Sequence, residues 1–111
     1  MGNPKFEITK TTNDEFMFNL KAGNGEVILT SQCYDKKQGC ENGITSVKEN
    51  APDSDNFEKK KAIDDSFYFT LKAQNGEVIG KSEMYTTTSA RDKGIESVKK
   101  NAPIASVEEK L

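Results

Sequence analysis

Histidine and tryptophan are absent from this chain of 111 residues, and cysteine occurs only twice. Without histidine, the chain has no imidazole for a catalytic dyad or triad and none to bind a metal. Cys33 and Cys40 are too few for a four-thiolate zinc site or for the disulfide framework of a small secreted protein. We therefore expect no catalytic residues, no metal site and no cofactor.

Long apolar stretches are also missing. No run of 18 apolar residues occurs and the first residues lack the apolar core of a signal peptide, so we expect a cytoplasmic protein with no membrane span. Hydrophobic residues make up 33% of the chain and charged residues 31%, which provides for one modest core but not for a deep ligand pocket. The net charge of −2 argues against a general nucleic-acid binder, although it is compatible with a local basic patch.

What the sequence does contain is an internal repeat. The segment LKAGNGEVI at residues 20–28 returns as LKAQNGEVI at residues 71–79. Around it, residues 6–52 align with residues 57–103 at a constant offset of 51, without a gap and with about half of the positions identical. Two copies are too few for a solenoid. We expect residues 1–111 to form one domain, with a pseudo-twofold axis between the two units.

Each unit begins with the pattern of three strands. Apolar residues alternate with others along FMFNLKA at the second strand, which is the period of a half-buried strand. An Asn-Gly pair then marks a tight hairpin turn. The predicted strands are residues 5–9, 16–22 and 26–34 in the first unit, and residues 56–60, 67–73 and 77–85 in the second.

The pairing across the hairpin has two candidate registers. A two-residue turn would pair Leu20 with Leu29, whereas a turn with a glycine bulge would pair Leu20 with Ile28. We favour the bulge, because Ile28 is unchanged in the second unit while Leu29 is replaced by Gly80.

The second half of each unit is predicted to be helical. Asp35 is the expected N-cap of the first helix, and Thr86 or Thr87 that of the second. Pro52 and Pro103 end the helices, since proline cannot continue them. The expected apolar stripes are Cys40, Ile44, Val47 and Ala51 in the first helix, and Ala90, Gly94, Ile95 and Val98 in the second.

Gly43 and Gly94 lie in the middle of these helices, where glycine costs about 1 kcal/mol relative to alanine. Glycine is nevertheless present at this position in both units. We interpret the two glycines as part of a seam of small residues that lets each helix lie close to the phenylalanine-rich sheet. A hinge or the approach of a ligand is the alternative.

Each unit is thus β-β-β-α, and the segments 53–60 and 104–110 can add strands after the helices. Either segment can cross to the sheet of the other unit, and residues 104–111 are expected to form a C-terminal strand or tail. The predicted fold class is α+β, with one antiparallel sheet and both helices packed on one of its faces.

The combined pattern of both units resembles a known family. The motif F-x-F-x-L-K-A-x-N-G-E-V-I, followed by S-x-x-Y and by G-I-x-S-V-K-x-N-A-P, is similar to the YegP-like family of short bacterial domains of unknown function. The resemblance implies tandem β-β-β-α-β units in one sheet, with last strands exchanged between units. It implies no activity and no binding residues. The first unit departs from the pattern of the second at residues 35–42, which makes the start of its helix harder to predict.

The sheet face opposite the helices is the expected interaction surface. Its candidate residues are Met17, Asn19, Lys21, Tyr68, Thr70 and Lys72. Aromatic residues beside lysines are typical of sheets that stack RNA bases, but only the second unit has an aromatic residue there.

We expect a monomeric, non-enzymatic binding or interaction module with an unidentified protein or peptide partner, acting through this face or through edge strands. Two alternatives stay open. One is binding of single-stranded nucleic acid through the same face, and the other is a thiol-dependent redox role for Cys33 or Cys40. The second unit has Met84 and Arg91 at the cysteine positions, which favours a structural or incidental role for the thiols.

Overall fold

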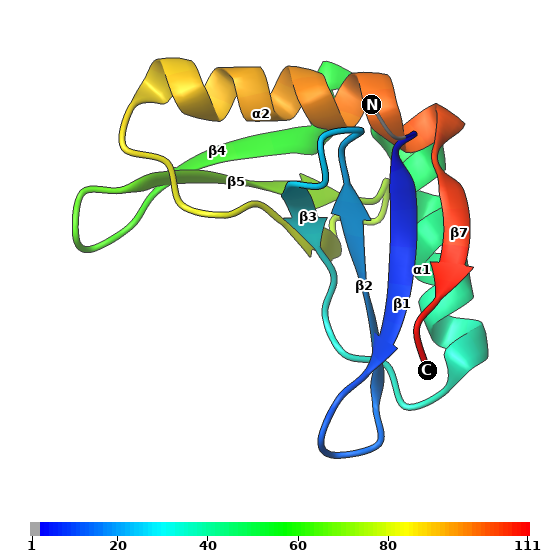
Figure 1. Cartoon of the computed structure of the whole chain (residues 1–111). Coiled ribbons are helices and arrows are strands. Elements are labelled where there is room, and N and C mark those ends of the chain that lie inside the picture. Colours follow the sequence, from blue (N-terminus) through cyan, green and yellow to red (C-terminus); the bar gives the residue numbers. More distant parts are fainter. Residues whose placement is uncertain (1–2) are drawn as a thin grey trace.

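The computed structural model describes residues 3–111, which form one sheet of seven strands and two α-helices (Figure 1). The strands are β1 (Lys5–Lys10), β2 (Phe16–Lys21), β3 (Val27–Thr30), β4 (Phe57–Lys61), β5 (Phe67–Lys72), β6 (Val78–Lys81) and β7 (Ser106–Glu109). The helices are α1 (Lys37–Asn50) and α2 (Thr88–Asn101), and short 3-10 turns at Ser54–Asn56 and Ala102–Ile104 follow them. The predicted α+β fold is confirmed.

The two units join at the middle of the sheet, whose strand order is β4-β5-β6-β3-β2-β1-β7. There β3 and β6 pair antiparallel, and Thr30 lies opposite Lys81, its counterpart in the second unit. The pseudo-twofold axis therefore passes through this pair of residues. In Figure 1, the β4–β5 hairpin and the β1–β2 hairpin extend away from the junction in different directions.

The C-terminal segment forms the outermost strand beside β1. The last strand of the second unit therefore pairs with the first unit, as the resemblance implied. β7 runs parallel to β1, with Ser106 opposite Lys5, whereas the other strand pairs described are antiparallel. We expected a wholly antiparallel sheet, but β7 is parallel to its neighbour because of the position at which α2 ends. That helix ends near the start of β1 (Figure 1), and the Ser106 amide donates to the carbonyl of Pro4, so the chain enters β7 at the same end.

Each Asn-Gly hairpin combines a glycine turn with a bulge further along the ladder. Gly25 has a φ of 88°, and its amide donates to the carbonyl of Ala22 at 2.9 Å, which closes the turn. The ladder then shifts by one residue at Ile28, which is bulged and has no pairing partner on β2, so Leu20 pairs with Leu29. The favoured pairing of Leu20 with Ile28 is wrong, because the second bulge cancels the shift that the glycine turn introduces. As a result, Ile28 and Leu29 are both buried.

The third strand of each unit is shorter than predicted. β3 ends at Thr30, and the hydroxyl of Ser31 then accepts a hydrogen bond from the amide of Phe18 at 2.9 Å. Regular pairing is interrupted there and returns at Tyr34, which exchanges two hydrogen bonds of 2.7 Å with Phe16. The second unit repeats this arrangement.

The two helices begin differently. The hydroxyl of Thr87 caps α2 by accepting a hydrogen bond from the Ala90 amide at 3.0 Å, which confirms one of the two threonines proposed. α1 begins after Lys36, whose side chain makes no capping hydrogen bond within residues 3–111. The expectation of Asp35 as the N-cap is wrong, because Asp35 lies one residue before the cap position, too early for its carboxylate to reach the free amides of the first turn.

Both helices pack closely on one face of the sheet, over a shared core. A Cβ atom at Gly43 would lie 3.1 Å from the ring of Phe18 and closer still to Tyr34, and Gly94 lies against the equivalent pair of rings. This contact confirms the seam of small residues. The predicted apolar stripes are buried, except that Ala90 is half-buried.

Leu29 and Gly80 differ between the units because they meet at the axis. A Cβ atom at Gly80 would lie 2.6 Å from side-chain atoms of Leu29. Two leucines related by the axis would need the same space in a close-packed core, so one unit carries glycine.

Candidate binding surface on the open sheet face

The sheet face opposite the helices, termed the open face, carries all six predicted surface residues. Phe18 and Phe69 point towards the helices, where they contact the helical glycines, so the side chains beside them along β2 and β5 point the other way. The open face therefore includes Met17, Asn19, Lys21, Tyr68, Thr70 and Lys72.

Thr70 differs from the exposed position that the sequence predicted. It is only 5% exposed, whereas the other five residues are half-buried. Neighbouring long side chains cover it, because Thr70 pairs across the ladders with Glu58 on β4 and with Lys81 on β6. Within residues 3–111 its hydroxyl has no hydrogen-bond partner. Thr70 thus keeps an unused donor and acceptor on the second unit's part of the open face, between β4 and β6.

In the second unit, one carboxylate holds two lysines in place. Glu58 forms ion pairs with Lys60, at 2.6 Å, and with Lys72. Hydrogen bonds from Lys60 and then from Lys72 lower the pKa of Glu58 to about 2. These groups are partly exposed, so the pairs add little stability, but they hold the ammonium groups over the sheet.

The first unit repeats this arrangement and extends it through β7. Glu7, the equivalent of the second-unit glutamate, pairs with Lys21 at 2.8 Å and with Lys5 at 3.2 Å. The hydrogen bond from Lys21 is the main cause of the lowered pKa of Glu7. Lys5 also reaches Glu108 at 3.4 Å, which in turn holds Lys110 at 2.7 Å.

The charge on the open face differs in sign from the charge of the whole chain. Among the strand residues that the structure describes, together with the residue after β7, the side chains on the open face include six lysines and three glutamates: Lys5, Lys21, Lys60, Lys72, Lys81 and Lys110 with Glu7, Glu58 and Glu108. The chain as a whole has a net charge of −2. The excess of acidic residues therefore lies on other surfaces.

Tyr68 is the centre of an apolar patch on the second unit. The ammonium group of Lys81 lies 4.8 Å from the centroid of the Tyr68 ring. Met84 is 47% exposed and Ile63 is fully exposed, and both line the same shallow depression of about 490 Å³ as Tyr68 and Lys81. These four residues are termed the Tyr68 patch. Lys61, Ala62 and Asp64 complete the lining of the depression, so it carries one carboxylate beside two ammonium groups.

Sequence reasoning missed three members of the Tyr68 patch. The face on which Lys81 lies depends on the bulge in β6, and Ile63 and Met84 lie in connections where strand alternation no longer applies. The available signal was the occurrence of large apolar residues inside polar loops, as in the segment AIDDS around Ile63.

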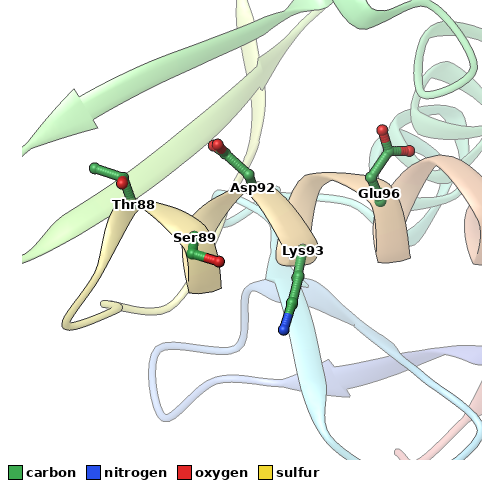
Figure 2. Close-up of a pocket in the computed structure, with 5 residues that line it drawn as sticks. All are labelled: Thr88, Ser89, Asp92, Lys93 and Glu96. Atoms are coloured by element: carbon green, nitrogen blue, oxygen red, sulfur yellow. The ribbon is translucent and has the colours of Figure 1, made fainter.

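A second depression, of about 480 Å³, lies on the exposed side of α2 (Figure 2). In Figure 2, Thr88, Asp92 and Glu96 project to one side of the helix, and Ser89 and Lys93 project to the other. This is the geometry of residues four apart on a helix. Because the polar groups diverge, they do not form a site that could surround a ligand.

The two cysteines give the redox alternative no support. Both are free; Cys33 is exposed and Cys40 is buried. Burial raises the pKa of Cys40 to about 11, whereas nucleophilic thiols have a depressed pKa. Among residues 3–111, no cluster of cysteine and acidic side chains could hold a metal ion. Over the same residues, no helix is long and apolar enough to cross a membrane.

Comparison with known families gives two matches along the chain. The domain of unknown function DUF1508 matches residues 12–58 and again residues 62–109. The chain belongs to the DUF1508 family. Each DUF1508 match spans the second and third strands and the helix of one unit, so the duplicated segments of the sequence are tandem DUF1508 repeats.

Bacterial relatives match this DUF1508 chain along most of its length. It is 48% identical to the UPF0339 protein YegP of Escherichia coli strain K12 and 49% identical to a UPF0339 protein of Shewanella oneidensis, each over 104 residues and 94% of both chains. A UPF0339 protein of Bordetella pertussis is 53% identical over 96 residues, which cover 86% of both chains. The resemblance to the YegP-like family is thus confirmed.

Solved structures share the fold. The solution NMR structure of the Escherichia coli YegP, described as a protein of unknown function, matches this DUF1508 chain with a TM-score of 0.93 at 45% identity, over 99% of this chain and 95% of that one. The solution NMR structure of the Shewanella oneidensis UPF0339 protein matches with a TM-score of 0.91 at 48% identity, over 96% and 91% of the two chains. These relatives establish the architecture, and their descriptions state no specific activity.

Proposed function

We propose that this DUF1508 chain is a small, non-enzymatic binding module that acts as a monomer in the cytoplasm and contacts its partner through the open face. The observation that carries the proposal is the Tyr68 patch, where an aromatic ring, an ammonium group and two exposed apolar side chains lie together. Apolar groups that are exposed together beside polar groups mark interaction sites.

The open face has a defined shape before any partner binds, which supports a role in recognition. β5 is paired on both sides, with β4 and β6, and β2 is paired with β1 and β3. Glu7 and Glu58 hold the lysines beside them by ion pairs. A surface that is already ordered loses less conformational entropy on binding, so more of the contact energy appears as affinity.

The available chemistry supports binding rather than catalysis. The chain has no histidine. Glu58 has its pKa lowered to about 2, so it stays ionised and paired, whereas a general base works best with a pKa near the operating pH. The two free cysteines also fit a reducing compartment, which supports the cytoplasmic location.

Photo-crosslinking from defined positions tests the proposal. A photoreactive phenylalanine analogue at Tyr68 or Met17 reports on the open face, and the same analogue at Lys93, on the exposed side of α2, is the matched control (Figure 2). In lysate from the native host, we expect crosslinks from both open-face positions that excess unlabelled chain abolishes, and only background from Lys93. Equal crosslinking from all three positions, or crosslinking from Lys93 alone, would contradict the assignment of the open face.

A further inference from the structure

We infer that the open face binds single-stranded nucleic acid, with one base stacked on Tyr68 and backbone phosphates contacted by the lysines around it. The inference rests on the proposed function of the open face and names its class of ligand. It depends on three properties that such surfaces combine: positive charge, an aromatic ring that a base can reach, and polar groups beside the ring.

The positive charge comes from the way in which lysines share carboxylates. Glu58 lies between Lys60 and Lys72, and Glu7 on β1 and Glu108 on β7 are each shared by two lysines in the same manner. One carboxylate neutralises one of two ammonium groups, so each cluster keeps an excess of positive charge. Lys72 lies four residues from Tyr68 along β5, about 13 Å at 3.3 Å per residue, a distance that a few nucleotides span.

The ring of Tyr68 is half-buried and lines the shallow depression, where a base can reach it. One of its faces carries the ammonium group of Lys81 at 4.8 Å, a contact that is weak at an exposed site. Stacking of a base on an aromatic side chain is stronger, so a base can displace the ammonium group. Lys81, which within residues 3–111 has no carboxylate at ion-pair distance, then becomes available to a phosphate. Met84 and Ile63 provide apolar contact around the base.

Thr70 supplies a polar group next to the stacking position. It lies two residues from Tyr68 on the same face and opposite Lys81 across the ladder. Within residues 3–111 its buried hydroxyl has no partner. When Lys81 moves towards a phosphate, the edge of a base or a ribose hydroxyl can satisfy this group, whereas an apolar peptide side chain cannot.

The same features favour a single strand over other polyanions. In a duplex, the faces of the bases are covered by their neighbours and cannot stack on a side chain. An acidic peptide offers charge but no planar ring for Tyr68. Binding should therefore depend on the ring and on the charge together.

Fluorescence anisotropy with a short labelled oligouridylate tests the inference on the full chain. We expect Tyr68→Ala to weaken binding roughly tenfold and Tyr68→Phe, which keeps the ring, to bind like the parent protein. Lys81→Met should weaken binding and reduce the slope of log K against log salt concentration by about 0.7, the value for one phosphate contact on a single strand. Lys93→Met, on α2, is the control and should change nothing. Amide NMR spectra of each variant verify the fold.

Competitors decide between a nucleic-acid site and a general anion surface. Unlabelled oligouridylate should compete, whereas inorganic polyphosphate, an aspartate-only peptide and an RNA duplex of equal length should compete much less. Equal competition by any of these three, or unchanged binding by Tyr68→Ala, would overturn the inference. Absence of oligouridylate binding at low salt would overturn it as well. In that case crosslinking from Tyr68 and Met17 would still report independently on whether the open face binds a partner.

Discussion

A methyl group added to α2 at Gly94 should destabilise the protein, although helix propensity alone predicts the opposite. In a helix interior, alanine is favoured over glycine by about 1 kcal/mol. The Cβ atom of an alanine at this position would lie 3.1 Å from Cε2 of Phe69 and 2.8 Å from Cζ of Tyr85. Both separations are shorter than the optimal contact between carbon atoms, about 3.5–4.0 Å.

The strain from this contact decides the sign of the effect. The ring of Tyr85 stacks on that of Phe69 with centroids 6.4 Å apart, and the backbone of Tyr85 exchanges hydrogen bonds with Phe67, so the ring cannot retreat without moving its neighbours. Overpacking of a well-packed core costs about 1–3 kcal/mol. With roughly 2 kcal/mol of strain against about 1 kcal/mol of propensity, Gly94→Ala should lower the free energy of unfolding by about 1 kcal/mol. For a chain of this size, Tm should fall by about 4 °C.

Gly39 in α1 provides the matched control. A Cβ atom there would lie 3.4 Å from Cδ1 of Tyr34, an ordinary contact, so Gly39→Ala should stabilise the protein by up to about 1 kcal/mol. Adding Tyr85→Phe to Gly94→Ala should recover part of the lost stability, because the hydroxyl nearest to the new methyl group is removed. Thermal and denaturant unfolding followed by circular dichroism measure all three proteins. If Gly94→Ala stabilised the protein as much as Gly39→Ala, the close packing of α2 on the sheet would be refuted.

Residues 1–55 alone should be largely unfolded or form a homodimer, because this fragment lacks β6 and β7; a dispersed amide NMR spectrum at monomer mass would contradict the shared sheet. At mildly alkaline pH, a disulfide reagent should modify Cys33 rapidly and Cys40 only as the protein opens, since burial raises the pKa of Cys40 to about 11; equal rates would show that Cys40 is accessible. In an NMR titration, the carboxyl group of Glu58 should have its midpoint near pH 2. Because its folded pKa is depressed, its contribution to stability is complete above the ordinary pKa of 4.5 and is lost as the pH falls towards 2. Lys60→Met should raise this midpoint, and an unchanged midpoint would exclude Lys60 as the cause.

The sequence predicted which residues lie on the open face better than it predicted how their side chains are arranged there. Strand alternation placed Met17 and Tyr68 on this face, because successive side chains of a strand point to opposite sides whatever the strand packs against. The burial of Thr70 was not predictable, since it depends on the long side chains of two neighbouring strands. For the same reason the position of Lys81 over Tyr68 appears only when β5 and β6 are paired.

Strand registers and helix starts were predictable from the sequence only in part. The glycine turn at Gly25 was predictable from the Asn-Gly pair, but the compensating bulge at Ile28 was not, because it brings Ile28 and Leu29 into the core together. A threonine cap for α2 followed from the hydroxyl groups of Thr86 and Thr87, and the structure selects Thr87. Asp35, an equally good capping residue, lies one position too early for the helix that packing on the sheet selects.

By itself, the sequence determined that the chain consists of two copies of one β-β-β-α unit, since alternation, turn residues, caps and prolines act over a few neighbouring positions. Only the tertiary structure decided how the copies are joined. β7 runs parallel to β1 because α2 ends beside the start of β1, and Leu29 is matched by Gly80 because the two positions meet at the axis. The direction of β7 and the close approach of Leu29 to Gly80 depend on residues far apart in the chain. Their contacts exist only after both units have folded onto one sheet.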